Sequence, residues 1–290
     1  MRVLIFDTET TGLPPKSGIT DQQLLTFSQV HCWNEVIHSW PYILQLSYIV
    51  FDTESNTIEK TVNQYVDIRR DIHISKQSIA VHKITYDSIQ NSENKTNIST
   101  LLSDFMIDVY SVELCIGHNV NFDRKMIIAE LIRNNLPWTD ILTFMDKNRF
   151  YCTMDKTKEK CNLRMEVSYT NRSGKLLTMN KIKMPKLSES HKHFFGYAPD
   201  EKMLHDAFMD VVICLRVFMI NEYNKDIYEG GLDAHQLVRI LWSPLHPLLP
   251  LSSLTPFEST FGTQSEFGTA LVVPNYLPPI ESFTPSIESS

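Results

Sequence analysis

The chain has 290 residues, 42% of them hydrophobic, so it is long enough to bury a core as one large domain or two small ones. Its formal net charge of −7 argues against a protein that binds nucleic acid by charge alone, because such binders carry a basic excess. The charge is uneven, however. Residues 147–192 hold twelve Lys or Arg against four Asp or Glu, whereas no Lys or Arg follows Arg239.

Three strands are predicted near the N-terminus. Arg2–Phe6 is a short apolar, β-branched run that ends at Asp7. Tyr42–Phe51 is a second run, and Thr57–Ile68 follows it after a turn-rich DTESN, which indicates an antiparallel start to the sheet. Residues 14–41 between the first two strands are rich in Pro, Gly, Ser and polar residues and are predicted to form a surface excursion.

Alternating helices and strands are predicted from Asn97 onward. We expect a helix from Asn97 to about Val112, a strand at Leu114–Ile116 and a helix from about Asn121 to Asn134. Such alternation favours parallel pairing. Leu204–Asn221 is apolar on nearly all sides of a helix, so we expect that helix to pack against the sheet.

The C-terminal region is predicted to lie outside the main domain. Residues 225–242 are expected to form a helical extension. Residues 243–290 hold eight of the fourteen prolines and many serines, which is typical of a mostly disordered tail. The alternative is a peptide motif for a polymerase or other protein partner, because Leu245–Leu251 and Leu271–Tyr276 are apolar islands within it.

Asp7 and Glu9 are the first candidate metal ligands. In a strand, residues i and i+2 point to the same face, so the two carboxylates lie close together. Each raises the pKa of the other unless a cation lies between them, and a hard divalent ion suits such a pair. The alternative is a polar strand end with solvated acids.

A second motif, GHNVNFD, occupies residues 117–123 between a predicted strand and a predicted helix. The carboxyl ends of strands in α/β sheets are where ligands gather. The simpler alternative for Asp123 is an acid at a helix start that interacts favourably with the helix dipole. The simpler alternative for Asn119 is a turn residue.

A third motif, HDAFMD, occupies residues 205–210 where the apolar helix opens. If both were helical, His205 and Asp210 would lie about 140° apart, so they converge only if His205 stays in the preceding loop. Asp206 is then placed to cap the helix. Asp210 lies in an apolar helix, where metal ligation offsets the cost of burying a carboxylate; a buried salt bridge is the alternative.

With these three motifs in this order, the chain resembles the DEDD superfamily of 3′→5′ exonucleases. The resemblance is to its DEDDh branch, which includes bacterial proofreading subunits and ribonuclease T. The resemblance covers about residues 2–222 and implies an exonuclease domain at 1–224. Lys83 departs from it by replacing the glycine of the family's H-G-I-T motif. Residues 161–184 depart as a basic insert, which we expect to form a hairpin or flap.

The resemblance implies an α/β, ribonuclease H-like mixed sheet, with its first three strands antiparallel and later strands parallel, flanked by helices. It implies His205 as general base, beside two Mg²⁺ or Mn²⁺ ions held by Asp7, Glu9, Asp123 and Asp210. It assigns the substrate contacts to Thr8, Thr10, Gly12, Leu13, His118, Asn119 and Phe122. For Leu13 and Phe122 the alternative is core packing. From their charge, Lys175, Lys181 and Lys183 of the insert are further candidates for phosphate contacts.

The predicted function is therefore metal-dependent 3′→5′ hydrolysis of DNA, at single-stranded or mismatched ends, with release of nucleoside 5′-monophosphates. An exoribonuclease or an inactive nucleic-acid-binding module is the alternative, and the five filled catalytic positions disfavour the inactive module. A zinc hydrolase is disfavoured because the sequence has no H-E-x-x-H motif. Five scattered cysteines, no leader pattern and no long apolar run predict an intracellular protein, cytoplasmic or nuclear, without a membrane partner.

Overall fold

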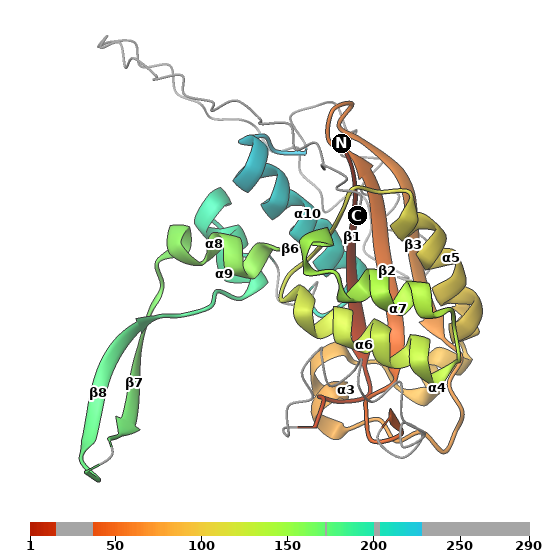
Figure 1. The fold of residues 1–290 in the computed structure, drawn as a ribbon, viewed down its shortest axis with the longest axis horizontal. Helices are drawn as coiled ribbons and strands as arrows, with labels where there is room; N and C mark the ends of the chain where they lie inside the picture. The colour runs from red at the N-terminus through yellow and green to blue at the C-terminus, as the bar shows by residue number, and fades with distance from the viewer. Residues whose placement is uncertain (16–36, 172, 200–203, 228–290) are drawn as a thin grey trace, which may run out of the picture. The chain divides into compact units, whose positions relative to one another are not determined.

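A six-stranded sheet in the order β4-β3-β2-β1-β5-β6 forms the centre of the computed structural model, which describes residues 1–15, 37–171, 173–199 and 204–227 (Figure 1). Its strands are β1 (Arg2–Thr10), β2 (Ile43–Asp52), β3 (Thr57–Val66), β4 (Lys95–Thr96), β5 (Leu114–Gly117) and β6 (Phe150–Cys152). The tail expected at 243–290, most of the extension expected at 225–242 and most of the excursion expected at 14–41 lie outside the described residues.

The pairing of the strands confirms the predicted mixed sheet. β1, β2 and β3 pair antiparallel in succession, whereas β5 pairs parallel with β1 and β6 pairs parallel with β5. β1 is longer than predicted, because it continues past Phe6 through Thr10 with a register shift between Glu9 and Thr10. The first two candidate carboxylates therefore lie within the strand rather than beyond its end.

Helices surround this sheet. The described helices are α3 (Lys76–His82), α4 (Tyr86–Gln90), α5 (Ile98–Tyr110), α6 (Val120–Arg133), α7 (Trp138–Met145), the short 3-10 turn η1 (Lys147–Arg149), α8 (Thr153–Cys161), α9 (Leu187–Phe195) and α10 (Ala207–Tyr223). Three of them, α5, α6 and α10, match the predicted helices within three residues at each end. None of the helices in the described part of the chain is long and apolar enough to cross a membrane.

Alternation along β1 divides the hydrophobic core into two layers. Leu4 and Phe6 belong to the larger cluster, which α5, α6 and α7 complete on one face of the sheet. Val3 and Ile5 belong to the other cluster, which α10 covers (Figure 1). Because successive side chains of a strand point to opposite faces, the odd-numbered residues that follow Ile5 point toward α10.

A separate two-stranded sheet consists of β7 (Arg164–Thr170) and β8 (Leu176–Ile182). Its turn is held by Asn171, whose side-chain oxygen accepts hydrogen bonds from the backbone N–H groups of Ser173 and Lys175. Gly174 has a φ of 78°, a conformation that glycine adopts without strain. The structure thus has a hairpin in the region where the sequence indicated a hairpin or flap.

Candidate active site

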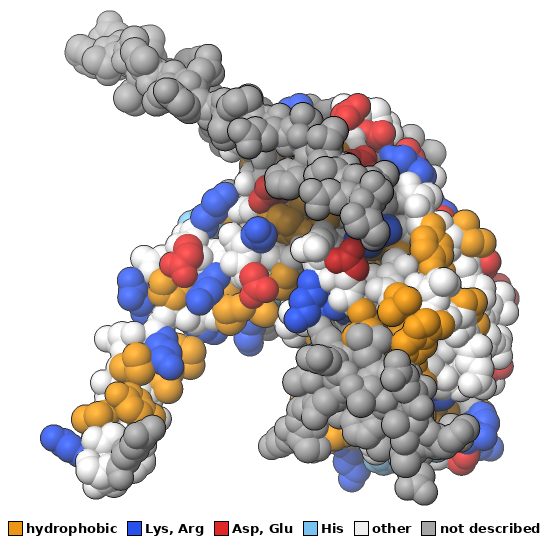
Figure 2. Space-filling model, viewed as in Figure 1, with side chains coloured by type: hydrophobic (Ala, Val, Ile, Leu, Met, Phe, Trp, Pro, Cys, Tyr) orange, Lys and Arg blue, Asp and Glu red, His pale blue; other side chains and the backbone are white. Residues whose placement is uncertain are grey.

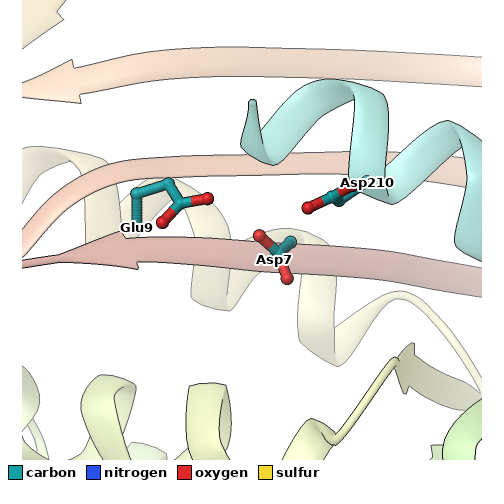
Figure 3. A group of neighbouring side chains, drawn as sticks. All are labelled: Asp7, Glu9 and Asp210. Carbon is teal, nitrogen blue, oxygen red and sulfur yellow. The ribbon is translucent and has the colours of Figure 1, made fainter. Parts of the chain in front are cut away.

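Three carboxylates meet on the α10 face of the sheet. Asp7 and Glu9 extend from β1, and Asp210 faces them from the first turn of α10 (Figure 3). One ligand oxygen from each lies within 4.8 Å of the others, which is the spacing of a site that can hold a metal ion. This group does not include Asp123, whose neighbours are described below.

Asp210 occupies its position because of how α10 begins. Asp206 is the N-cap, and its side chain accepts hydrogen bonds from the backbone N–H groups of Phe208 and Met209. His205 precedes the cap with a φ of 68°, outside the helix, as convergence of the two residues requires. The backbone N–H of His205 donates to the carboxylate of Asp210, so the loop and the helix are joined at the site.

Asp123 approaches β1 from α6, on the opposite layer of the core. Its Oδ1 accepts a hydrogen bond from the backbone N–H of Thr8 at 3.0 Å and another from the Thr8 hydroxyl at 2.7 Å. The Asp123 side chain is 2% exposed. Thr8 therefore orients the fourth predicted carboxylate, whose charge acts on Asp7, Glu9 and Asp210.

The electrostatics of these acids favour a bound cation. Burial, and then the charges of the neighbouring acids, raise the pKa of Asp7 well above its usual value and that of Glu9 to about 9. Burial also raises the pKa values of Asp123 and Asp210 to about 7. Asp210 Oδ1 is buried and has no hydrogen-bond partner. The donor set consists only of carboxylate oxygens, which suits a hard divalent cation.

The His205 side chain is exposed, beside two lysines. Partial burial, and then the charges of Lys186 and Lys83, lower the pKa of the His205 imidazole. Lys83 is the departure from the family's glycine, and it has a φ of 61° where a glycine would be unstrained. An uncharged imidazole at neutral pH is what the predicted role of general base needs.

Both ring nitrogens of His118, predicted to contact substrate, already bind protein atoms. Nε2 donates to the Pro185 carbonyl at 3.0 Å, and Nδ1 lies 2.9 Å from the Thr153 hydroxyl. Burial lowers the pKa of His118 to about 4, so the ring is neutral. His118 thus connects the loop before α6 to the segment before α9. Its neighbour Asn119 has a φ of 63° and makes no capping hydrogen bond with its side chain.

The turn after β1 is held by backbone contacts that the sequence did not reveal. The buried His82 donates from Nε2 to the Thr10 carbonyl, and the backbone N–H of Ser75 donates to the Thr11 carbonyl. Thr11 also exchanges hydrogen bonds with the backbone of Tyr42. No sequence signal identifies these contacts, because they join loops distant in the chain.

Leu13 and Gly12 are open to solvent. Leu13 is 82% exposed, which excludes core packing for it, and a Cβ added to Gly12 would meet nothing within 4 Å. Both line a cavity of about 360 Å³ that Trp40, Tyr42 and Arg69 also line. Phe122, by contrast, is partly buried against the larger core cluster.

The sequence of residues 4–218 matches the RNase_T exonuclease family, a span of nearly three quarters of the chain. The chain belongs to the exonuclease family. That membership agrees with the carboxylate cluster, and it confirms the family recognised from the three motifs. No curated protein sequence matches this exonuclease-family chain.

Solved structures share the fold. E. coli exonuclease I in complex with a dT13 oligonucleotide matches with 16% identity and a TM-score of 0.50, over 79% of this chain and 42% of that one. E. coli exonuclease I in complex with a 5cy-dT13 oligonucleotide matches with 15% identity and a TM-score of 0.50, over 82% of this chain and 45% of that one. Cell-death related nuclease 4 (CRN-4) matches with 14% identity and a TM-score of 0.48, over 77% of this chain and 64% of that one. The exonuclease-family chain therefore spans less than half the length of the exonuclease I chains that it matches.

Proposed function

We propose that this protein is a metal-dependent 3′→5′ exonuclease that removes nucleoside 5′-monophosphates from the 3′ end of DNA. The observation that carries the proposal is the cluster of Asp7, Glu9 and Asp210, three carboxylates within 4.8 Å with an unpaired buried oxygen. Removing them from water in this arrangement costs free energy unless cations neutralise them. The preferred substrate is a single-stranded or mismatched end.

The metal ligands would be Asp7, Glu9, Asp210 and Asp123. A pair of Mg²⁺ or Mn²⁺ ions, when bound, supplies Lewis acidity for in-line displacement at the phosphate. Thr8 orients Asp123 and favours its ionised form through its two hydrogen bonds. His205 would accept the proton of the attacking water, since its lowered pKa leaves the imidazole neutral.

The 3′-terminal nucleotide would lie against the turn after β1. Leu13 offers an exposed apolar surface for the base, and Gly12 leaves room for close approach of the backbone. Asn119 and the exposed part of Phe122 would also contact this nucleotide, and Thr10 supports the turn by donating its hydroxyl to the Gly12 carbonyl at 2.8 Å. The cavity beside Leu13 supplies aromatic and cationic side chains in Trp40, Tyr42 and Arg69, which suit a nucleotide.

DNA is favoured over RNA because exonuclease I, which shares the fold, was solved with dT13 oligonucleotides. Recognition of a 2′-hydroxyl depends on local contacts, so an RNA substrate is the alternative to be tested. An intracellular location and a protein partner for residues 243–290 remain predictions of the sequence.

The test uses single-stranded DNA and RNA of one sequence, labelled at either end and incubated with Mg²⁺ or with EDTA. We expect stepwise shortening from the 3′ end of DNA that requires metal and is abolished in Asp7→Asn and His205→Ala. His193→Ala changes an exposed histidine on α9 and is the matched control. Shortening from the 5′ end, or shortening that persists in EDTA, would refute the proposal, and a preference for RNA would replace DNA as substrate.

A further inference from the structure

The β7–β8 hairpin has one apolar face. Residues paired across antiparallel strands point to the same side of the sheet. The register pairs Met165 with Lys181, Val167 with Met179 and Tyr169 with Leu177, so five large apolar side chains share one side. We call the set Met165, Val167, Tyr169, Leu177 and Met179 the apolar hairpin face.

The opposite side of the same hairpin is polar at its centre. There Glu166 pairs with Asn180, and Ser168 pairs with Thr178. A segregated pattern of this kind is typical of a sheet that covers something on one side only. The polar side therefore supplies control positions at the same depth in the same two strands.

Solvent reaches the apolar hairpin face. Met165 is 44% exposed, Tyr169 45% and Met179 40%. The two strands pair only with each other among the described strands, and hydrophobic side chains lie open along them in Figure 2. An isolated hairpin with exposed apolar residues has little to stabilise it in water, and a contiguous exposed apolar surface marks an interaction site.

The charge around this face identifies the occupant. Residues 162–186 contain one acid, Glu166, and six bases: Arg164, Arg172, Lys175, Lys181, Lys183 and Lys186. A chain with a net charge of −7 thus concentrates positive charge beside an apolar surface. Single-stranded nucleic acid has the complementary chemistry, a polyanionic backbone with exposed base faces, whereas a duplex hides those faces.

The hairpin is also linked to the candidate site through the segment that follows it. Its base is closed by a hydrogen bond from the Lys183 N–H to the Leu163 carbonyl at 2.7 Å. Two residues later the Pro185 carbonyl accepts from His118 of the second motif, and Lys186 lies within electrostatic range of His205. A strand whose 3′ end is at the carboxylates can therefore continue along the hairpin.

We propose that the apolar hairpin face stacks bases of the substrate strand 5′ of its terminal nucleotide, while the surrounding lysines bind its phosphates. This inference rests on the proposed function, because it supposes a 3′ end at the carboxylate cluster. Base stacking on protein side chains tolerates any sequence, because every base has a flat face that can stack. The hairpin thereby gives the enzyme preference for single strands long enough to reach it.

The test compares two double variants on opposite faces of the hairpin. Tyr169→Ser with Met179→Thr removes apolar surface, and Ser168→Ala with Thr178→Ala is the matched control. Binding of fluorescein-labelled dT20, and of an abasic strand of equal length, is measured by anisotropy in EDTA so that neither strand is degraded. We expect the apolar-face variant to bind dT20 about 5- to 30-fold more weakly, or about 1–2 kcal/mol, which corresponds to one or two lost stacking contacts of the weakest kind.

Abasic strand binding should be equal in all three proteins, and Tyr169→Phe should bind dT20 like wild type. Equal dT20 affinity in both double variants, or an equal loss on the abasic strand, overturns the proposal. Sedimentation gives the oligomeric state of each protein. If wild type is a dimer, the apolar-face variant is a monomer and both bind dT20 equally, the face is a protein interface instead.

Hydrolysis of a trinucleotide, which is too short to reach the hairpin, separates this inference from the proposed function. The apolar-face variant should cleave it at the wild-type rate with Mg²⁺. If wild type leaves the trinucleotide and dT20 intact, the proposed function fails. If wild type cleaves both and the two double variants bind alike, only the hairpin inference fails.

Discussion

At the scale of single residues, the site brings together three acidic side chains that repel one another when ionised. Asp7, Glu9 and Asp210 are held together by β1 and the first turn of α10. The fold therefore bears the repulsion between them, and sites of this kind commonly reduce stability in exchange for activity. A bound cation would relieve that repulsion.

Asp210→Asn should stabilise the metal-free protein while abolishing hydrolysis. The folded-state pKa of Asp210 is raised from 3.8 to about 7. The protonated carboxyl therefore contributes favourably to folding stability below pH 4, and this contribution is lost as the pH rises through 7 and the group ionises. Asparagine cannot ionise, and at pH 8 in EDTA we expect a gain of about 1–3 kcal/mol in unfolding free energy. Thermal unfolding measures this.

Mg²⁺ provides the control for that prediction. It should raise the melting temperature of wild type and have a smaller effect on Asp210→Asn, because the variant has lost a ligand. The gain in EDTA should also shrink at pH 4, where the wild-type carboxyl is protonated. A variant less stable than wild type at pH 8 would contradict the electrostatic account.

Thr8→Val should shift the acid limb of the activity profile. Valine keeps the shape of the 4%-exposed Thr8 side chain but removes the hydroxyl that donates to Asp123 at 2.7 Å. Because that bond stabilises the ionised carboxylate, its loss raises the pKa of Asp123 further. We expect half-maximal activity about one pH unit higher. Thr8→Ser restores the hydroxyl and should restore the profile; an unchanged valine profile would show that Thr8 only packs.

At the scale of elements, the site follows from two local patterns that are readable in the sequence, a strand period and a helix start. The period of two along β1 places Asp7 and Glu9 on one face, and the structure extends the strand so that this holds through Thr10. The start of α10 at Ala207 leaves His205 in the loop, as the geometric argument required. Hydrophobic pattern and capping chemistry are local properties, which is why they could be predicted.

The parts that could not be predicted are contacts between distant loops. Nothing near His118 in the sequence indicates that its ring joins Pro185, and nothing near His82 indicates its contact with Thr10. The cavity beside Leu13 likewise brings together three stretches of chain with no periodic pattern. Lys83 was recognised as a departure from the family, but its proximity to His205 required the fold.

The lysines of the hairpin should set the salt dependence of binding. Lys175 and Lys181 are exposed, whereas Lys183 forms an ion pair with Glu189 at 2.5 Å. Each phosphate contact on a single strand contributes about 0.7 to the slope of log K against log salt concentration. Lys175→Ala with Lys181→Ala should therefore reduce that slope by about 1.4, with a smaller effect of Lys183→Ala. An unaltered slope would make the hairpin lysines a solvated surface.

At the scale of the whole molecule, the two core layers meet at β1, and each brings part of the site. The α10 layer presents Asp210, and the α6 layer presents Asp123, whose charge acts on both Asp7 and Asp210. A change that shifts either layer relative to β1 therefore separates the carboxylates, even when it lies far from them. Interiors packed at high density transmit such shifts, so activity should be more sensitive than stability to core substitutions near this strand.

Removal of residues 248–290 should leave the catalytic unit intact. The compact unit that holds the carboxylates ends at Pro247, and the family match ends at residue 218, beyond Asp210. All described elements also end by Tyr223. We expect a chain that ends at Pro247 to keep the melting temperature of the full chain and its rate on a trinucleotide. Calorimetry and single-turnover hydrolysis measure both; a lost rate at an unchanged melting temperature would assign part of the substrate site to the removed residues.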